Sequence, residues 1–221
     1  MTSETITLNA DDGHELTAYV ARPAGAAKGG LVILQEIFGV TSHIQSVTDG
    51  FAAEGYLAIA PAMFDRVKPG IVLSYNDFET ARGTMAQLDR DQCVLDMKAA
   101  ADYVRSAGKV GIVGFCWGGS MADLAACNGL VDAGVSYYGR MTVEWLDLQP
   151  QCPMLYHYGE TDSLIPSETI EKIQRKRKGH VRVWGGAGHG FNCNDRPDYH
   201  KASATKAMEI TLGFLAEHLA D

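Results

Sequence analysis

Short segments that are apolar at nearly every position recur along the chain. They lie at 29–37, 56–61, 109–115, 133–139, 153–159 and 181–185. A strand that is apolar on both sides of the pleat is typical of a sheet covered on both faces. We therefore expect these segments to form the strands of one buried, mostly parallel sheet.

Helical patterns separate the apolar segments. They predict helices at about 42–54, 77–88, 91–107 and 117–127, one that starts near 166, and a last one at 200–219. Thr41 or Ser42 can cap the first helix, and Gly55 can end it. At the start of the chain, residues 4–8 and 14–23 flank the turn sequence NADDG, which predicts a β-hairpin. Strands alternating with helices indicate an α/β protein with helices on both faces of the sheet.

Composition narrows the classes of function. Of 221 residues, 46% are hydrophobic and 21% charged, which suits a folded core, and no linker or repeat divides the chain, so we expect one domain over 1–221. The formal net charge of −8 disfavours nucleic-acid binding. No apolar run is long enough to span a membrane and no signal-peptide pattern opens the chain, so we expect a cytoplasmic protein. The basic run RKRK at 175–178 is expected to be the solvated end of a helix.

The sequence GFCWGGS places a cysteine at a tight turn between a strand and a helix. Gly114 and Gly118 flank Cys116 in the pattern Gly-x-nucleophile-x-Gly, in which small neighbours allow the strained backbone of an exposed nucleophile. The following helix starts at the thiol, and its N-terminal partial charge favours a thiolate. The alternative is a glycine-rich turn with a buried, unreactive cysteine. The five cysteines form no CxxC pair, so we expect no metal site.

Two further reactive side chains follow later predicted strands. Asp162 follows the segment 153–159, and His189 follows the segment 181–185. The order nucleophile, acid, base is the one found in α/β-hydrolases, where the three meet at the carboxyl ends of the strands. In a Cys-Asp-His triad, the histidine takes the thiol proton and the aspartate orients the imidazole. Separately, a loop aspartate is usually a turn former and a loop histidine is usually just exposed.

The end of the first apolar segment supplies further candidates. The backbone N–H groups of Ile37 and Trp117 are expected to form the oxyanion hole. Glu36 is unusual there, because a carboxylate beside a thiolate opposes its ionisation; the alternative is a solvent-exposed acid. Tyr138 follows another strand, and its ring is expected either in the pocket wall or in the core.

These motifs together resemble those of the dienelactone hydrolase family, the carboxymethylenebutenolidases. The resemblance rests on QEIFG, GFCWGG, GETD and GAGHGF and runs over nearly the whole chain. It implies an α/β-hydrolase fold, a triad of Cys116, Asp162 and His189, and hydrolysis of a small ester or enol-lactone through an acyl-thioester, without cofactor or metal. It also implies that Glu36 associates with the neutral resting thiol and moves when substrate binds.

The resemblance has one departure. The family holds the substrate carboxylate with two arginines. Arg82 lies in the helix that matches the first, but Cys193 stands where the second is expected, with Arg196 three residues later. A general carboxylesterase or thioesterase therefore stays open as an alternative, as does a non-catalytic or redox-sensing protein of this fold. The expected partner is a small ester or lactone, with no nucleic acid or membrane, and the expected assembly is a monomer or small homo-oligomer.

Overall fold

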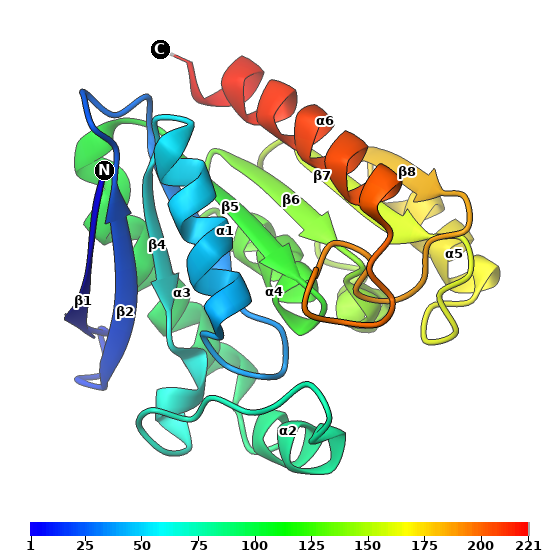
Figure 1. The fold of residues 1–221 in the computed structure, drawn as a ribbon, viewed down its shortest axis with the longest axis horizontal. Helices are drawn as coiled ribbons and strands as arrows, with labels where there is room; N and C mark the ends of the chain where they lie inside the picture. Colours follow the sequence, from blue (N-terminus) through cyan, green and yellow to red (C-terminus); the bar gives the residue numbers. More distant parts are fainter. Residues whose placement is uncertain (221) are drawn as a thin grey trace.

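The computed structural model describes residues 1–220, and its centre is one eight-stranded sheet (Figure 1). The strands are β1 (Thr2–Asn9), β2 (Glu15–Arg22), β3 (Gly30–Leu34), β4 (Leu57–Pro61), β5 (Val110–Phe115), β6 (Ala133–Tyr137), β7 (Met154–Gly159) and β8 (His180–Trp184). Their order in the sheet is β1-β2-β4-β3-β5-β6-β7-β8. The pairs β1–β2 and β2–β4 are antiparallel, and all later pairs are parallel. The predicted mostly parallel sheet with an N-terminal hairpin is confirmed.

Helices cover both faces of this sheet. They are α1 (Ser42–Ala53), α2 (Phe78–Met85), α3 (Arg90–Val104), α4 (Trp117–Cys127), α5 (Ser167–Lys176) and α6 (Lys201–Leu219), with three 3₁₀ helices, η1 (Met63–Arg66), η2 (Arg105–Ala107) and η3 (Arg140–Trp145). Helices α1 and α6 pack on one face, and α3 and α4 on the other (Figure 1). Helix α2 lies apart from both layers, at the edge where the parallel strands end.

The pattern of apolar residues explains how far each strand is buried from solvent. Every residue of β3, β4, β5, β6 and β7 is buried, as expected for strands with helices on both faces. Strand β8 is the edge strand and remains partly exposed. In the hairpin, β2 alternates between exposed and buried positions up to Val20, and Gly13 has φ +82° in the connecting turn.

The predicted elements differ from the structure in several places, and two of them concern the pocket. The first apolar segment leaves the sheet after Leu34, so Glu36 and Ile37 lie in a loop beyond β3 rather than on the strand. The segment 140–145, for which no element was expected, forms η3. Helix α1 begins as predicted, because the Thr41 side chain accepts a hydrogen bond from the Ile44 N–H at 3.4 Å.

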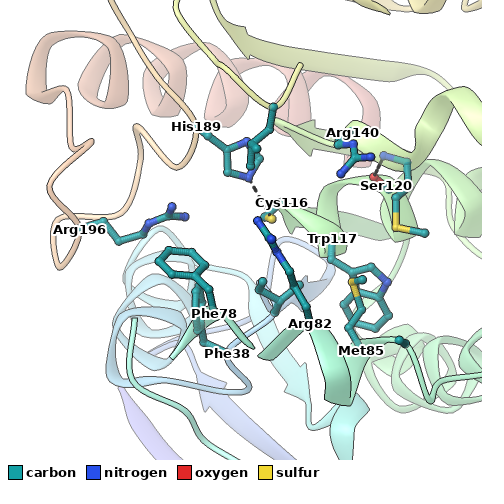
Figure 2. Close-up of a pocket in the computed structure, with 14 residues that line it drawn as sticks. Phe38, Phe78, Arg82, Met85, Cys116, Trp117, Ser120, Arg140, His189 and Arg196 are labelled. Atoms are coloured by element: carbon teal, nitrogen blue, oxygen red, sulfur yellow. Dashed lines mark hydrogen bonds between the residues drawn. The ribbon is translucent and has the colours of Figure 1, made fainter. Parts of the chain in front are cut away.

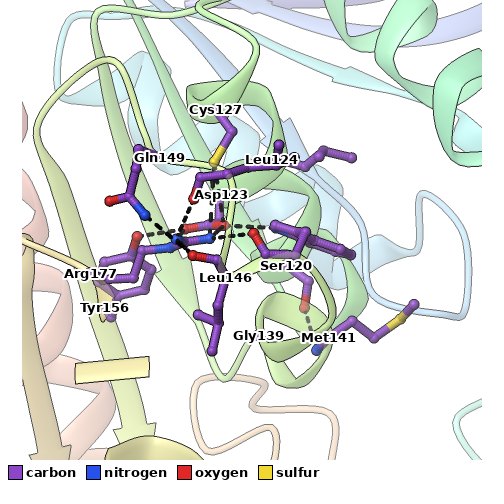
Figure 3. A network of polar contacts seen from close by, with 12 residues as sticks. Ser120, Asp123, Leu124, Cys127, Gly139, Met141, Leu146, Gln149, Tyr156 and Arg177 are labelled. Atoms are coloured by element: carbon purple, nitrogen blue, oxygen red, sulfur yellow. Dashed lines mark hydrogen bonds and ion pairs between the residues drawn. The ribbon is translucent and has the colours of Figure 1, made fainter. Parts of the chain in front are cut away.

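The expected solvated helix end at 175–178 is wrong for one residue. Arg177 is only 3% exposed and forms an ion pair with Asp123 of α4 at 2.8 Å (Figure 3). The helix ends at Lys176, and extended backbone at Arg177 turns its side chain under the sheet edge, toward α4. Arg175 fits the expectation, with a side chain 64% exposed.

Candidate active site

The turn between β5 and α4 carries Cys116 in a strained backbone conformation. Cys116 has φ +55° and ψ −117°, which side chains other than glycine rarely adopt. A Cβ atom at Gly114 would lie 1.8 Å from the Gly118 carbonyl oxygen, and one at Gly118 would lie 2.4 Å from the Gln35 carbonyl oxygen. Strand and helix therefore pack so closely that only glycine fits at these two positions, and the cysteine side chain is raised above the sheet edge.

The three side chains predicted as a triad meet at this edge. The Cys116 Sγ lies 3.0 Å from the His189 Nε2 (Figure 2). On the other side of the ring, the His189 Nδ1–H donates to the Asp162 Oδ2 at 2.8 Å. Asp162 is 4% exposed, and its other oxygen accepts from the Leu164 N–H at 2.8 Å. These contacts hold the carboxylate toward the imidazole. The geometry allows proton transfer between sulfur and Nε2.

The ionisation of His189 follows from its two neighbours. Burial alone would lower the pKa of His189, but negative charge on the Cys116 sulfur and the hydrogen bond to Asp162 raise it to about 10. The imidazole is thus a base strong enough to hold a proton taken from the sulfur. The pair can store the thiol proton on Nε2, from which it can be delivered to a leaving group.

Two backbone N–H groups beside Cys116 are free. Neither Ile37 N–H nor Trp117 N–H has a hydrogen-bond acceptor within residues 1–220. Ile37 belongs to the loop after β3, and Trp117 is the first residue of α4, so both border the same pocket as Cys116. Free donors next to a nucleophile are suited to a developing oxyanion.

A pocket of about 320 Å³ opens above Cys116 and His189. Most of its wall is apolar, formed by Ile37, Phe38, Phe78, Met85, Trp117, Met141 and Leu164. Three arginines complete it, Arg82 from α2, Arg140 at the start of η3, and Arg196 (Figure 2). No aspartate or glutamate among the described residues lines this pocket. It is suited to a small, partly apolar anion.

Glu36 is buried beside the pocket, at 1% exposure, and does not contact the thiol. Its Oε1 accepts from Arg196 Nη1 at 3.2 Å, while its Oε2 has no hydrogen-bond partner within residues 1–220. Arg196 Nη2 also lies 3.7 Å from the Asp198 Oδ2. The expected association of Glu36 with Cys116 is not present in this arrangement, in which His189 holds the sulfur.

The sequence model of the dienelactone hydrolase family matches residues 16–219. The chain belongs to the dienelactone hydrolase family. Carboxymethylenebutenolidases of Pseudomonas putida and Pseudomonas knackmussii are each 34% identical to it over 229 positions, which cover 98% of this chain and 97% of the relative. The chain is therefore a hydrolase of dienelactone type that acts on small molecules.

Solved structures agree with this assignment. A Klebsiella pneumoniae protein crystallised as a candidate dienelactone hydrolase matches with a TM-score of 0.87 and 28% identity, over 98% of this chain and 100% of that chain. An alpha-beta serine hydrolase homologue from Coxiella burnetii matches with a TM-score of 0.72 and 17% identity, over 96% of this chain and 97% of that chain. The second likeness concerns the fold alone, and it confirms the predicted α/β-hydrolase architecture.

The family resemblance led us to expect two arginines at the pocket. Arg82 lies in the pocket wall, on α2. Cys193 is fully buried and lines no part of the pocket, whereas Arg196 reaches into it. A Cβ at Gly190 would lie 2.4 Å from Arg196 Nη1, so the glycine after His189 leaves room for this guanidinium. Arg196 therefore occupies the wall although its position in the sequence is shifted.

The place of Tyr138 in the pocket wall is corrected. Its side chain is 0% exposed and does not line the pocket. Its backbone has a positive φ of 42°, and its ring packs edge-on against His189 and Phe191, with centroids 5.1 and 5.4 Å away. Its hydroxyl has no hydrogen-bond partner in the described chain. Tyr138 thus supports the imidazole from behind.

Sequence reasoning missed several pocket residues. Phe38 and Phe78 pack edge-on against each other, with ring centroids 5.4 Å apart, and both lie beside the Arg196 guanidinium, whose carbon is 6.0 and 5.9 Å from their ring centroids. Arg140 also escaped notice, although it follows β6 and so obeys the strand-end rule that identified the triad. Within residues 1–220, no group of three or more His, Cys, Asp or Glu side chains could hold a metal ion, and none of the helices there has the length and hydropathy to cross a membrane.

Proposed function

We propose that this hydrolase cleaves a small carboxylic ester or enol-lactone through an acyl-thioester on Cys116. The observation that carries the proposal is the continuous contact from Cys116 Sγ to His189 Nε2 and from His189 Nδ1 to Asp162, at 3.0 and 2.8 Å, at the base of a pocket. Such a relay lets a neutral thiol become a nucleophile without a metal or cofactor.

The acylation step uses each of these groups. His189 Nε2 takes the thiol proton while sulfur attacks the carbonyl carbon. The carbonyl oxygen becomes negative and accepts hydrogen bonds from the N–H groups of Ile37 and Trp117. Collapse of this intermediate breaks the carbon–oxygen bond, and His189 gives its proton to the leaving oxygen. For a lactone, the leaving oxygen stays attached to the acyl chain.

Deacylation reverses the roles. His189 Nε2 takes a proton from water, whose oxygen attacks the thioester carbon. The same two N–H groups donate hydrogen bonds to the second oxyanion. Collapse releases the carboxylic acid, and the proton on His189 returns to the sulfur. Asp162 stabilises the imidazolium in both half-reactions and stays ionised throughout.

Glu36 has the part of a switch acid in this proposal. With its carboxylate on Arg196, Cys116 is free to exchange its proton with His189. A carboxylate turned toward the sulfur would oppose thiolate formation. The single 3.2 Å contact and the unpartnered Oε2 support a carboxylate that can exchange partners. Arg82 and Arg196 are the proposed anchors for a carboxylate on the substrate.

The proposal is tested by trapping the acyl-enzyme. We expect phenyl acetate to acetylate Cys116 within the first turnover, and intact-protein and peptide mass spectrometry to locate the label. Cys116→Ala should lower kcat/KM by about 10³-fold or more, because the covalent route is lost. Cys152→Ala is the matched control, since Cys152 is a half-buried cysteine far from the pocket.

Two results would reject the proposal. One is full turnover by Cys116→Ala, and the other is a label on a different residue. Comparing an enol-lactone with an aryl ester and a thioester then decides the substrate class. Equal rates for all three would favour a general esterase.

A further inference from the structure

The three arginines of the pocket differ in how their charge is balanced. Arg196 is engaged by Glu36 and lies near Asp198. Arg82 and Arg140 form no ion pair among the described residues; Arg90 and Arg182 are also without one, but they do not line this pocket. Both are exposed at the rim of a cavity that contains no acidic side chain. Two positive charges are thus left for a ligand to balance.

Arg140 is carried by an unusually well-fixed backbone. The residue before it, Gly139, is so enclosed that a Cβ would lie 2.5 Å from Ser136 Oγ and 2.7 Å from Ser120 N. The residue after it, Met141, donates its N–H to Ser120 Oγ at 2.9 Å (Figures 2 and 3). Ser120 lies in the first turn of α4, close to Cys116 in the sequence. The backbone of Arg140 is therefore tied to the helix that carries the nucleophile, while its side chain is left free.

The arginines approach Cys116 from different directions. In Figure 2, Arg140 and Arg196 lie on opposite sides of Cys116, and Arg82 reaches toward it from α2. A substrate carbonyl must lie at the sulfur, between them. One carboxylate anchored on the side of Arg196 cannot also satisfy Arg140.

We propose that the substrate carries two anionic groups, one on each side of the carbonyl that Cys116 attacks, and that Arg140 binds the second. The substrate class is an ester or lactone that bears two carboxylates. Ser120 acts as a positioning residue for Arg140 by holding the Met141 N–H. This inference rests on the proposed ester hydrolysis and adds a specificity that the two anchors Arg82 and Arg196 do not supply.

Four aryl esters test it. They are phenyl acetate, monophenyl glutarate with a carboxylate on the acyl side, 4-acetoxybenzoate with one on the leaving group, and mono(4-carboxyphenyl) glutarate with both. The measured quantity is the ratio of kcat/KM for each charged ester to that for phenyl acetate. We expect the ratio to be highest for the doubly charged ester, and to decrease with added salt because both arginines are exposed.

The variants assign each carboxylate to an arginine. Arg140→Met should lower the ratio for the doubly charged ester about tenfold, the effect of one charge-assisted hydrogen bond. Arg140→Lys should retain part of the preference. Arg82→Met should reduce the preference for the other carboxylate of the ester, the one that Arg140 does not bind. Arg175→Met removes the same charge from an exposed position on α5 and should leave every ratio unchanged.

Three results distinguish a failure of this inference from a failure of the proposed function. If the doubly charged ester is no better than the better singly charged one, or if Arg140→Met leaves all ratios as in the wild type, the inference is rejected while ester hydrolysis stands. If Arg140→Met and Arg82→Met abolish the preference for the same carboxylate, the second anion is likewise rejected. If the wild type hydrolyses none of the four esters, the proposed function fails, and this inference with it.

Discussion

Two of the buried arginine–carboxylate pairs are built in opposite ways. The pair Arg177–Asp123 lies between α4 and the end of α5, and both side chains are 0% exposed (Figure 3). Asp123 accepts four hydrogen bonds from nitrogen or hydroxyl donors, two from Arg177, one from Tyr156 Oη and one from Trp145 Nε1. Arg177 donates in addition to backbone carbonyls, including that of Leu148 at 2.7 Å. Every charge in this network is fully paired.

The pair Arg196–Glu36 is only half paired. It has one hydrogen bond of 3.2 Å, and the second oxygen of Glu36 has no partner within residues 1–220. The aromatic rings of Phe38 and Phe78 lie beside the guanidinium in place of further acceptors. A buried charge is costly unless it is paired and hydrogen-bonded. We call Arg177–Asp123 the closed pair and Arg196–Glu36 the open pair. The comparison teaches that the closed pair fixes α4 against the end of α5, whereas the open pair can exchange partners beside the thiol.

The largest effect is expected from breaking the closed pair. Arg177→Met leaves the Asp123 carboxylate buried without a counter-charge, which should lower the free energy of unfolding by about 3–5 kcal/mol. Arg175→Met, two residues earlier, removes an exposed charge and should change it by less than about 0.5 kcal/mol. Urea unfolding followed by circular dichroism measures both. Equal effects of the two variants would show that the buried network does not stabilise the fold.

This closed pair also marks a limit of sequence reasoning. Asp123 and Arg177 are 54 residues apart, and RKRK has the composition of a solvated helix end. Only the turn of the chain after α5 buries Arg177 and leaves Arg175 in water. No pattern in the local sequence predicts an ion pair between residues so far apart in the chain.

Sequence reasoning reached further where each residue follows a strand. Cys116, Asp162 and His189 could be placed together because the carboxyl ends of parallel strands meet at one edge. Arg196 could not be placed, because it lies in an irregular loop, and its side chain depends on room beside Gly190 and on contact with two aromatic rings. The choice between pocket wall and core for Tyr138 could not be made either, because its backbone has a positive φ that no sequence pattern indicated.

A smaller effect is expected from an isosteric change in each pair. Asp123→Asn replaces one accepting oxygen by an NH₂ group that faces donors on every side, so we expect a loss of about 2–3 kcal/mol in the free energy of unfolding. Glu36→Gln can place its NH₂ group where Oε2 has no partner and keep its oxygen for Arg196. Its cost should stay below about 1 kcal/mol.

Urea unfolding of both variants under one condition measures this difference. The two substitutions are chemically the same, so the difference reports only how fully each carboxylate is paired. A larger loss in Glu36→Gln than in Asp123→Asn would reverse the comparison. It would mean that the pocket pair is the more rigid of the two.

An effect that builds up gradually with pH concerns a third buried group, which has no opposite charge beside it. His157 on β7 accepts from Trp184 Nε1 at its Nδ1, and its Nε2 lies 3.1 Å from Thr211 Oγ1 of α6. Burial, with the charge of Arg182, lowers the pKa of His157 from 6.5 to about 3. The ring therefore stays neutral in the folded protein, which contrasts with both arginine pairs.

This neutral histidine predicts a pH dependence of stability. Because the folded pKa lies below the unfolded one, the unfolded chain binds the proton first, so stability present above pH 6.5 is lost as the pH falls toward about 3. The expected slope is at most about 1.4 kcal/mol per pH unit, seen between pH 6.5 and 5, before most carboxylates titrate. His157→Gln, which retains a donor and an acceptor, should flatten the slope by that amount, measured by urea unfolding at several pH values. An unchanged slope in the variant would mean that His157 can be protonated in the folded protein. The buried ring between β7 and α6 would then tolerate a positive charge without a counter-ion, whereas the buried charge of Arg177 is balanced by Asp123.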